Sequence, residues 1–160
     1  MPARVYVETS VISYLAARPS RDLITAARQQ ITHEWWRRRR PNFEVFVSEL
    51  VLDEARAADP DAATRRAELL ANVLLLEITS VSVGLARCLI EEVSLPQQAG
   101  ADALHIATAA CRGVDYLLTW NAAHSANAEF RPRVERTCRA HGYEPPVLCT
   151  PDELMGEQTT

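Results

Sequence analysis

Four side chains in this sequence stand where a parallel β-sheet would bring polar groups together. Glu8 and Asn121 each follow a strand-like run, Glu54 lies in a helical stretch after another strand, and Asp102 lies in the first turn of a helix. In open parallel sheets, ligands bind beyond the carboxyl ends of the strands. Carboxylates crowded at such an edge would repel each other and would need a cation, so the chemistry to consider is the binding of a divalent metal ion.

Each of these residues also has an ordinary explanation. An aspartate at a helix start is usually a cap, and a glutamate inside a helix is usually solvated. A polar residue after a strand usually belongs to a turn. Near Glu54, the acids Glu49 and Asp53 are expected to be solvated neighbours, and Asp53 is a rival for the same role. Position alone therefore leaves both explanations open for every residue.

The elements that must position these side chains alternate along the chain. Apolar runs of strand length lie at residues 3–8, 43–47, 74–78, 115–120 and 147–149. Helical spacing of apolar residues is found at 11–17, 22–36, 48–55, 60–70, 83–93, 101–111 and 131–141, and a connector is expected at 121–128. Helix caps are expected at Thr9 and Ser10, at Asp22, at Ser48 and at Asp59. About five strands alternating with helices predict an α/β domain with a parallel sheet covered on both faces.

Length and composition bound the architecture. A chain of 160 residues points to one domain, expected at residues 1–150 with a C-terminal tail at 151–160. The four cysteines lack close pairing and are expected to be free thiols, and the lone C-x-x-H pair of Cys138 and His141 does not predict a zinc site. We find no signal peptide and no apolar run long enough to span a membrane, so the expected location is the cytoplasm.

The charged residues exclude some functions and some reaction mechanisms. The net charge is −4, which does not indicate a general polyanion binder. All 17 basic residues are arginines, so mechanisms that need a lysine are excluded. Residues 35–40 read Trp-Trp-Arg-Arg-Arg-Arg. This run could contact RNA by stacking and charge, or it could be a helix C-terminus with one tryptophan packed inward.

The order and spacing of four segments resemble the PIN-domain nucleases, in particular the VapC-type toxins of toxin–antitoxin systems. The resemblance covers nearly the whole chain. The matching segments are Val5–Leu15, Ser48–Glu54, Asp102–Ala107 and Asp115–Asn121. It implies a three-layer αβα PIN-like fold with a parallel sheet of about five strands. It also implies a Mg²⁺- or Mn²⁺-dependent endoribonuclease, paired with an antitoxin protein and commonly a homodimer.

The resemblance also assigns candidate roles to individual residues. It implies that Glu8, Glu54, Asp102 and Asn121 are the metal ligands and catalytic residues. Thr119 is a further catalytic candidate, because it would lie near them and could hydrogen-bond a ligand or water, although it could also be an ordinary β-branched strand residue. The family has an aspartate where this chain has Glu8, and an acid where it has the neutral Asn121. We expect His105, one helical turn from Asp102, to be a structural partner. The missing fourth acid supports an alternative: an impaired PIN-like module that binds nucleic acid or protein and regulates without cutting.

Overall fold

Five parallel strands form one sheet at the centre of the molecule. The structure is a computed structural model that describes residues 1–94, 99–121 and 125–156. The strand order is β3-β2-β1-β4-β5, and every neighbouring pair is parallel. The strands are β1 (Arg4–Val7), β2 (Glu44–Ser48), β3 (Leu74–Leu76), β4 (Tyr116–Leu118) and β5 (Val147–Cys149). The predicted α/β class and the five-stranded parallel sheet are therefore confirmed.

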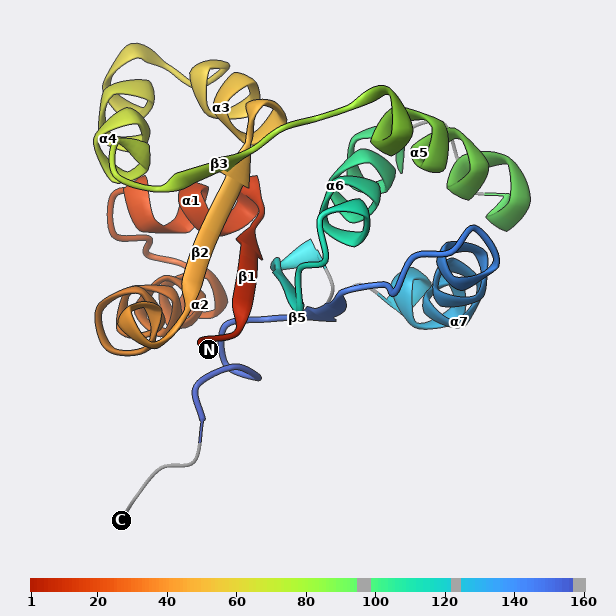
Figure 1. Cartoon of the computed structure of the whole chain (residues 1–160). Helices are drawn as coiled ribbons and strands as arrows, with labels where there is room; N and C mark the ends of the chain where they lie inside the picture. The colour runs from red at the N-terminus through yellow and green to blue at the C-terminus, as the bar shows by residue number, and fades with distance from the viewer. Residues whose placement is uncertain (95–98, 122–124, 157–160) are drawn as a thin grey trace.

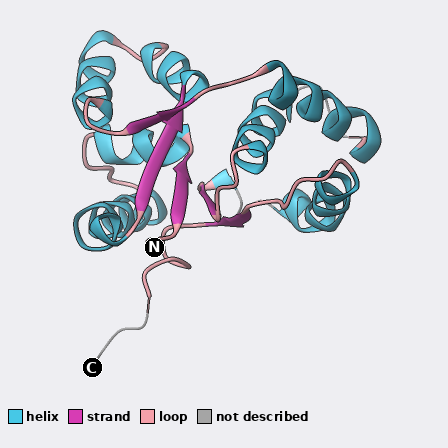
Figure 2. Ribbon diagram, in the orientation of Figure 1, coloured by secondary structure: helices cyan, strands magenta, loops and turns pink. Residues whose placement is uncertain are grey.

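Two groups of helices flank this sheet (Figures 1 and 2). The first group packs together beside the β1–β3 half and consists of α1 (Thr9–Ala16), α2 (Leu23–Glu34), α3 (Glu49–Arg56) and α4 (Pro60–Leu70). The second group consists of α5 (Ser80–Val93), α6 (Gly100–Cys111) and α7 (Ser125–Ala140), with α5 packed against both α6 and α7. Among the described residues, every helix is too short or too polar to cross a lipid bilayer.

The core lies along the central strands. Val5, Tyr6 and Val7 on β1 are buried on both faces of the sheet, as are Leu117 and Leu118 on β4. Such continuous apolar runs are typical of parallel strands that helices cover on both sides. Because β1 is central and its last three residues are fully buried, the residue that follows it is held on a rigid support.

Three expected boundaries are corrected by the structure. Helix α1 is capped by Glu8 rather than by Thr9 or Ser10, because the Glu8 carboxylate accepts the Ser10 N–H. Helix α5 begins at Ser80, where Thr79 forms a capping box with Ser82, and not at residue 83. Helix α7 begins at Ser125, so the connector expected at 121–128 is wrong from that residue onward. The caps at Asp22 and Asp59 are confirmed.

The arginine run lies at the amino-terminal edge of the sheet. A π-helix (Trp35–Arg39) and a 3₁₀ turn (Arg40–Asn42) lead directly into the start of β2. Trp35 is fully buried, whereas Trp36 is half-buried beneath the Arg40 guanidinium, so one tryptophan packs inward as expected. Arg39 donates to the carbonyl of Leu154, which connects this edge to the segment after β5. The run is thus at the opposite edge from Glu8, which follows the carboxyl end of β1.

Candidate functional site

The strand register places Glu8 beside Thr119. The chain runs from β1 outward to β2 and β3 on one side, and β4 and β5 lie on the other side. Val7 pairs with Leu118, and the Glu8 N–H donates to the Leu118 carbonyl at 3.0 Å. Glu8 and Thr119 therefore leave adjacent strands at the point where the strand order reverses. This is the position at which open α/β sheets bind ligands.

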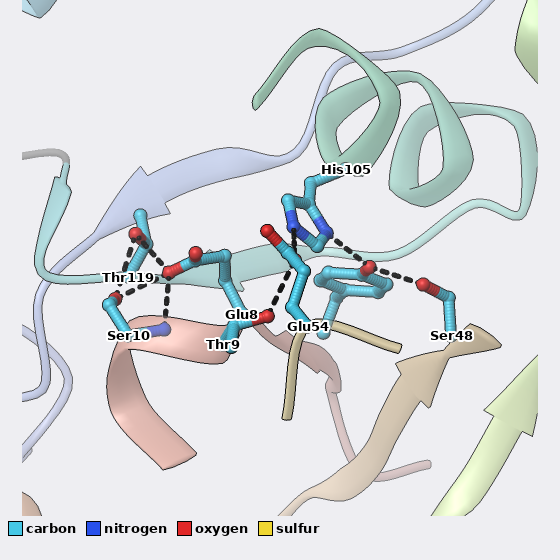
Figure 3. A network of polar contacts seen from close by, with 8 residues as sticks. Glu8, Thr9, Ser10, Ser48, Glu54, His105 and Thr119 are labelled. Atoms are coloured by element: carbon cyan, nitrogen blue, oxygen red, sulfur yellow. Dashed lines mark hydrogen bonds and ion pairs between the residues drawn. The ribbon is translucent and has the colours of Figure 1, made fainter. Parts of the chain in front are cut away.

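One oxygen of the Glu8 carboxylate receives three hydrogen bonds (Figure 3). Oε2 accepts from the Ser10 N–H at 2.9 Å, from the Ser10 hydroxyl, and from the Thr119 hydroxyl at 2.8 Å. The side chain is only 5% exposed, so these donors replace the water that a carboxylate would otherwise bind. Oε1 receives none of these three bonds. Because it belongs to the same rigid carboxylate group, the bonds to Oε2 also fix its orientation.

The two hydroxyls that hold Glu8 are themselves fixed by the chain after β4. The Trp120 N–H donates to the Ser10 oxygen at 2.9 Å, and the Asn121 N–H donates to the Thr119 oxygen at 3.0 Å. Trp120 is buried, and its indole N–H donates to the Thr32 hydroxyl at 2.9 Å. Trp120 therefore anchors the turn that carries Thr119 and Asn121.

A second polar network holds Glu54. Its Oε1 accepts the Thr9 hydroxyl at 2.7 Å and contacts Nε2 of His105 at 2.8 Å. Burial would raise the pKa of the Glu54 carboxyl, but the hydrogen bonds from His105 and Thr9, with the charge interaction with His105, outweigh burial and lower it. Glu54 is thus held as an anion, with Oε2 outside these two contacts.

Behind Glu54, the network continues into the core. Nδ1 of His105 lies 2.6 Å from the Tyr6 hydroxyl, which lies 2.7 Å from the Ser48 hydroxyl. Burial, and to a smaller extent the charges of Glu8 and Glu54, raise the pKa of Tyr6, so its hydroxyl keeps its proton. With a neutral His105 ring, Ser48 donates to Tyr6, Tyr6 donates to Nδ1, and Nε2–H donates to Glu54. Each hydrogen bond in this series, from Ser48 to Glu54, is then donated in the direction of the Glu54 carboxylate.

This network predicts a pH-dependent stability. Because the folded pKa of Glu54 lies below its ordinary value, its contribution is present at neutral pH and is lost as pH falls below about 4.5. Wild type should therefore be more stable than Glu54→Gln at pH 7, and the difference should shrink toward pH 3. Urea unfolding midpoints of both proteins across that range measure this. A difference that stays constant down to pH 3 would contradict the assignment.

Asp102 and Asn121 complete the candidate site. Asp102 lies exposed in the first turn of α6, where a negative charge is favourable. A pocket is lined by Glu8, Asp102, Thr119 and Asn121, with the ring of His105 and three apolar side chains. Glu54 does not line it directly and connects to it through His105. Within the described chain, ligand atoms of Glu8, Glu54 and Asp102 do not all come within 4.8 Å of one another.

The sequence did not identify several members of these networks. Ser10 and Thr9 were expected to cap α1, but their hydroxyls bind Glu8 and Glu54 instead. Ser48 stands at the cap position of α3 without a side-chain cap bond, because its hydroxyl contacts Tyr6. The tyrosine in an otherwise apolar buried strand was the available signal, since a buried phenol needs a hydrogen-bond partner.

The two acids near Glu54 in the sequence, Glu49 and Asp53, do not join the network. Asp53 is exposed and pairs with Arg56 at 2.8 Å, and Glu49 is exposed. His105 is almost fully buried between Tyr6 and Glu54. His124, which lies in the expected connector, is outside the described residues. Of the acids on α3, Glu54 is therefore the one that joins the network at the carboxyl edge of the sheet.

In fold, this chain is a three-layer αβα domain of the PIN-like class. It is similar to a chain of the VapBC2 complex of Rickettsia felis, solved bound to a DNA fragment from its promoter, with a TM-score of 0.61 at 13% identity. That alignment covers 92% of this chain and 98% of the other. It is also similar to VapC20 of Mycobacterium tuberculosis, a toxin that cleaves the sarcin–ricin loop, with a TM-score of 0.58 at 18% identity. There the alignment covers 89% and 99%.

No protein-family model matches the sequence, and no curated protein matches it. The likeness therefore lies in the fold, which extends over nearly the full length of both solved chains. It confirms the PIN-like architecture that the sequence resemblance implied. It does not assign roles to individual residues, which have to be argued from the geometry of this chain.

Proposed function

We propose that this protein is a VapC-type toxin: a metal-dependent endoribonuclease that hydrolyses RNA phosphodiester bonds and is inhibited by a cognate antitoxin. The observation that carries the proposal is the buried Glu8 carboxylate, clamped at the point where the strand order reverses, beside Asp102 and Asn121. The likeness to VapC20, which cleaves an RNA loop, supports the same activity. Cytoplasmic location and homodimerisation belong to this proposal.

The residues present suit Mg²⁺ or Mn²⁺. These cations prefer oxygen ligands, and the pocket offers carboxylate and amide oxygens from Glu8, Asp102 and Asn121. Glu8 and Glu54 each keep one oxygen outside the bonds that orient them. Mg²⁺ usually retains several waters, so the spacing of the three acids does not prevent their joint action. When bound, such an ion lowers the pKa of a water and neutralises charge on the phosphate.

The chain's own residues would prepare the site. Ser10 and Thr119 hold the Glu8 carboxylate in one orientation, so no rearrangement is needed when substrate arrives. His105 and Thr9 do the same for Glu54. The Asn121 amide offers an oxygen without a charge, which lowers the negative charge of the cluster by one compared with four acids.

Cleavage of a mixed RNA pool by purified, partner-free protein tests the proposal. We expect fragments with Mn²⁺ present, none after chelation, and none from Asp102→Asn, whose neutral amide cannot replace the charge. The matched control is Asp61→Asn on α4, which is exposed and outside the pocket. If wild type leaves the RNA intact with Mn²⁺ present, the enzyme proposal fails.

A second function is favoured by the neutral Asn121: a PIN-like module that binds nucleic acid or protein without cutting. It predicts that RNA or antitoxin binding persists while cleavage is absent. Asn121→Asp discriminates between the two, because restoring the acid should then create Mn²⁺-dependent cleavage that wild type lacks. If wild type already cleaves, this second function is wrong.

A further inference from the structure

A second cluster of metal-binding side chains lies away from the candidate nuclease site, between α5 and α7. Cys88 and Glu92 stand one helical turn apart on α5, and His141 follows the last residue of α7. Their ligand atoms all lie within 4.8 Å of one another, and Nε2 of His141 lies 3.1 Å from Oε1 of Glu92. A thiol, a carboxylate and an imidazole from two packed helices thus converge on one point.

We propose that Cys88, Glu92 and His141 bind a zinc ion. Zinc is bound in proteins by cysteine, histidine and acidic side chains at about 2.0–2.3 Å, which places tetrahedral ligand atoms roughly 3.3–3.8 Å apart. The His141–Glu92 pair is already near that spacing, and the Cys88 sulfur lies within 4.8 Å of both ligand atoms, so only a small side-chain adjustment is needed. All three side chains are partly or fully accessible, so they can adjust. A water would fill the fourth position.

The helix ends around this cluster favour a cation. Glu92 lies in the last turn of α5, and His141 immediately follows α7. The carbonyl groups at a helix C-terminus carry a partial negative charge, which stabilises positive charge nearby. Two helices end beside the cluster, so their dipoles add to the attraction of the Glu92 carboxylate.

The cysteine that sequence spacing associates with His141 is a poor alternative ligand. Cys138 forms the C-x-x-H pair, but its side chain is fully buried. Burial raises the pKa of the Cys138 thiol to about 11, which disfavours the thiolate that zinc requires. Cys88 lies 53 positions before His141 in the chain, so only the folded arrangement of α5 and α7 brings the two together. Zinc should therefore bind the folded state and stabilise it.

The test uses untagged, reduced, full-length protein stripped of metal. Calorimetric titration should give one zinc ion per chain, and Co²⁺ should produce the absorption of a thiolate ligand together with tetrahedral d–d bands. Cys88→Ser and His141→Gln should each weaken zinc binding by about tenfold or more. Both side chains are accessible, and melting of the metal-free variants checks that they fold.

Two controls separate this site from other sources of binding. His33→Gln, an exposed histidine on α2, should leave zinc affinity unchanged. Glu8→Gln should also leave it unchanged, so that failure of the nuclease proposal does not affect this result. The proposal is overturned if Co²⁺ gives no thiolate band, or if Cys88→Ser and His141→Gln bind zinc as tightly as wild type.

Discussion

Replacing Glu8 with glutamine should abolish metal-dependent RNA cleavage while leaving the protein folded. The amide oxygen of glutamine can still accept the Ser10 and Thr119 hydrogen bonds, so the cap of α1 and the local packing should persist. The negative charge that attracts a divalent ion is lost. We expect a fall of about 100-fold or more in cleavage rate and a clear fall in Mn²⁺ affinity. Initial rates and Mn²⁺ titrations measure these effects.

The matched control for Glu8→Gln is Glu49→Gln. Glu49 is exposed in the first turn of α3 and makes none of the contacts of the candidate site. It should leave both the rate and the Mn²⁺ affinity unchanged. If Glu8→Gln retains wild-type cleavage, Glu8 is not a catalytic residue, and the clamp from Ser10 and Thr119 is only structural.

Trp35→Ala should be among the most destabilising single substitutions in the chain. The indole is fully buried and stacks on Phe43 with ring centroids 5.9 Å apart. Truncating a buried aromatic side chain to alanine costs about 3–5 kcal/mol, because it loses burial and leaves a cavity. For a chain of this size the melting temperature should fall by roughly 10 °C. Denaturant unfolding and thermal melting both measure the effect.

Trp36→Ala is the matched control for Trp35→Ala. Trp36 has the same side chain at the next position, but it is only half-buried under Arg40. It should lose about 1 kcal/mol or less, since less apolar area leaves the core. Equal losses for the two substitutions would contradict the inward packing of Trp35. Because both residues lie at the amino-terminal edge of the sheet, neither change should remove the candidate catalytic groups.

Most of the fold could be predicted from local patterns. Apolar runs of strand length marked the strands, and Asp22 and Asp59 marked two helix starts because capping is a local interaction. Helix α7 was placed too late, because it was expected from residue 131 and begins at Ser125. In the structure Pro132 lies inside α7. The division into a domain at 1–150 and a tail at 151–160 stays a prediction.

The candidate site, like the fold, could be predicted from the sequence only in part. Glu8 and Asn121 could be placed at one edge because both come after the carboxyl ends of parallel strands. The partners that orient the acids could not be predicted. Thr9 and His105 reach Glu54 across 45 and 51 positions, and Ser48 reaches Tyr6 across 42. Hydroxyls next to a helix start look like caps in the sequence, and only the packed structure decides which acceptor they reach.

The Glu8 carboxylate caps helix α1 and also carries the charge that is proposed to bind a metal ion. Selection for folding and selection for activity would therefore both act on position 8. Neutral helix caps such as Ser and Asn could replace it in starting the helix, whereas only an acid keeps the charge that the proposed metal ion would need. The substitutions at position 8 would therefore have one order when ranked by the cellular abundance of the protein and another when ranked by its activity. Under the proposed function, loss of activity at this position need not impair folding, so inactive and well-folded descendants of this chain would be only one substitution away.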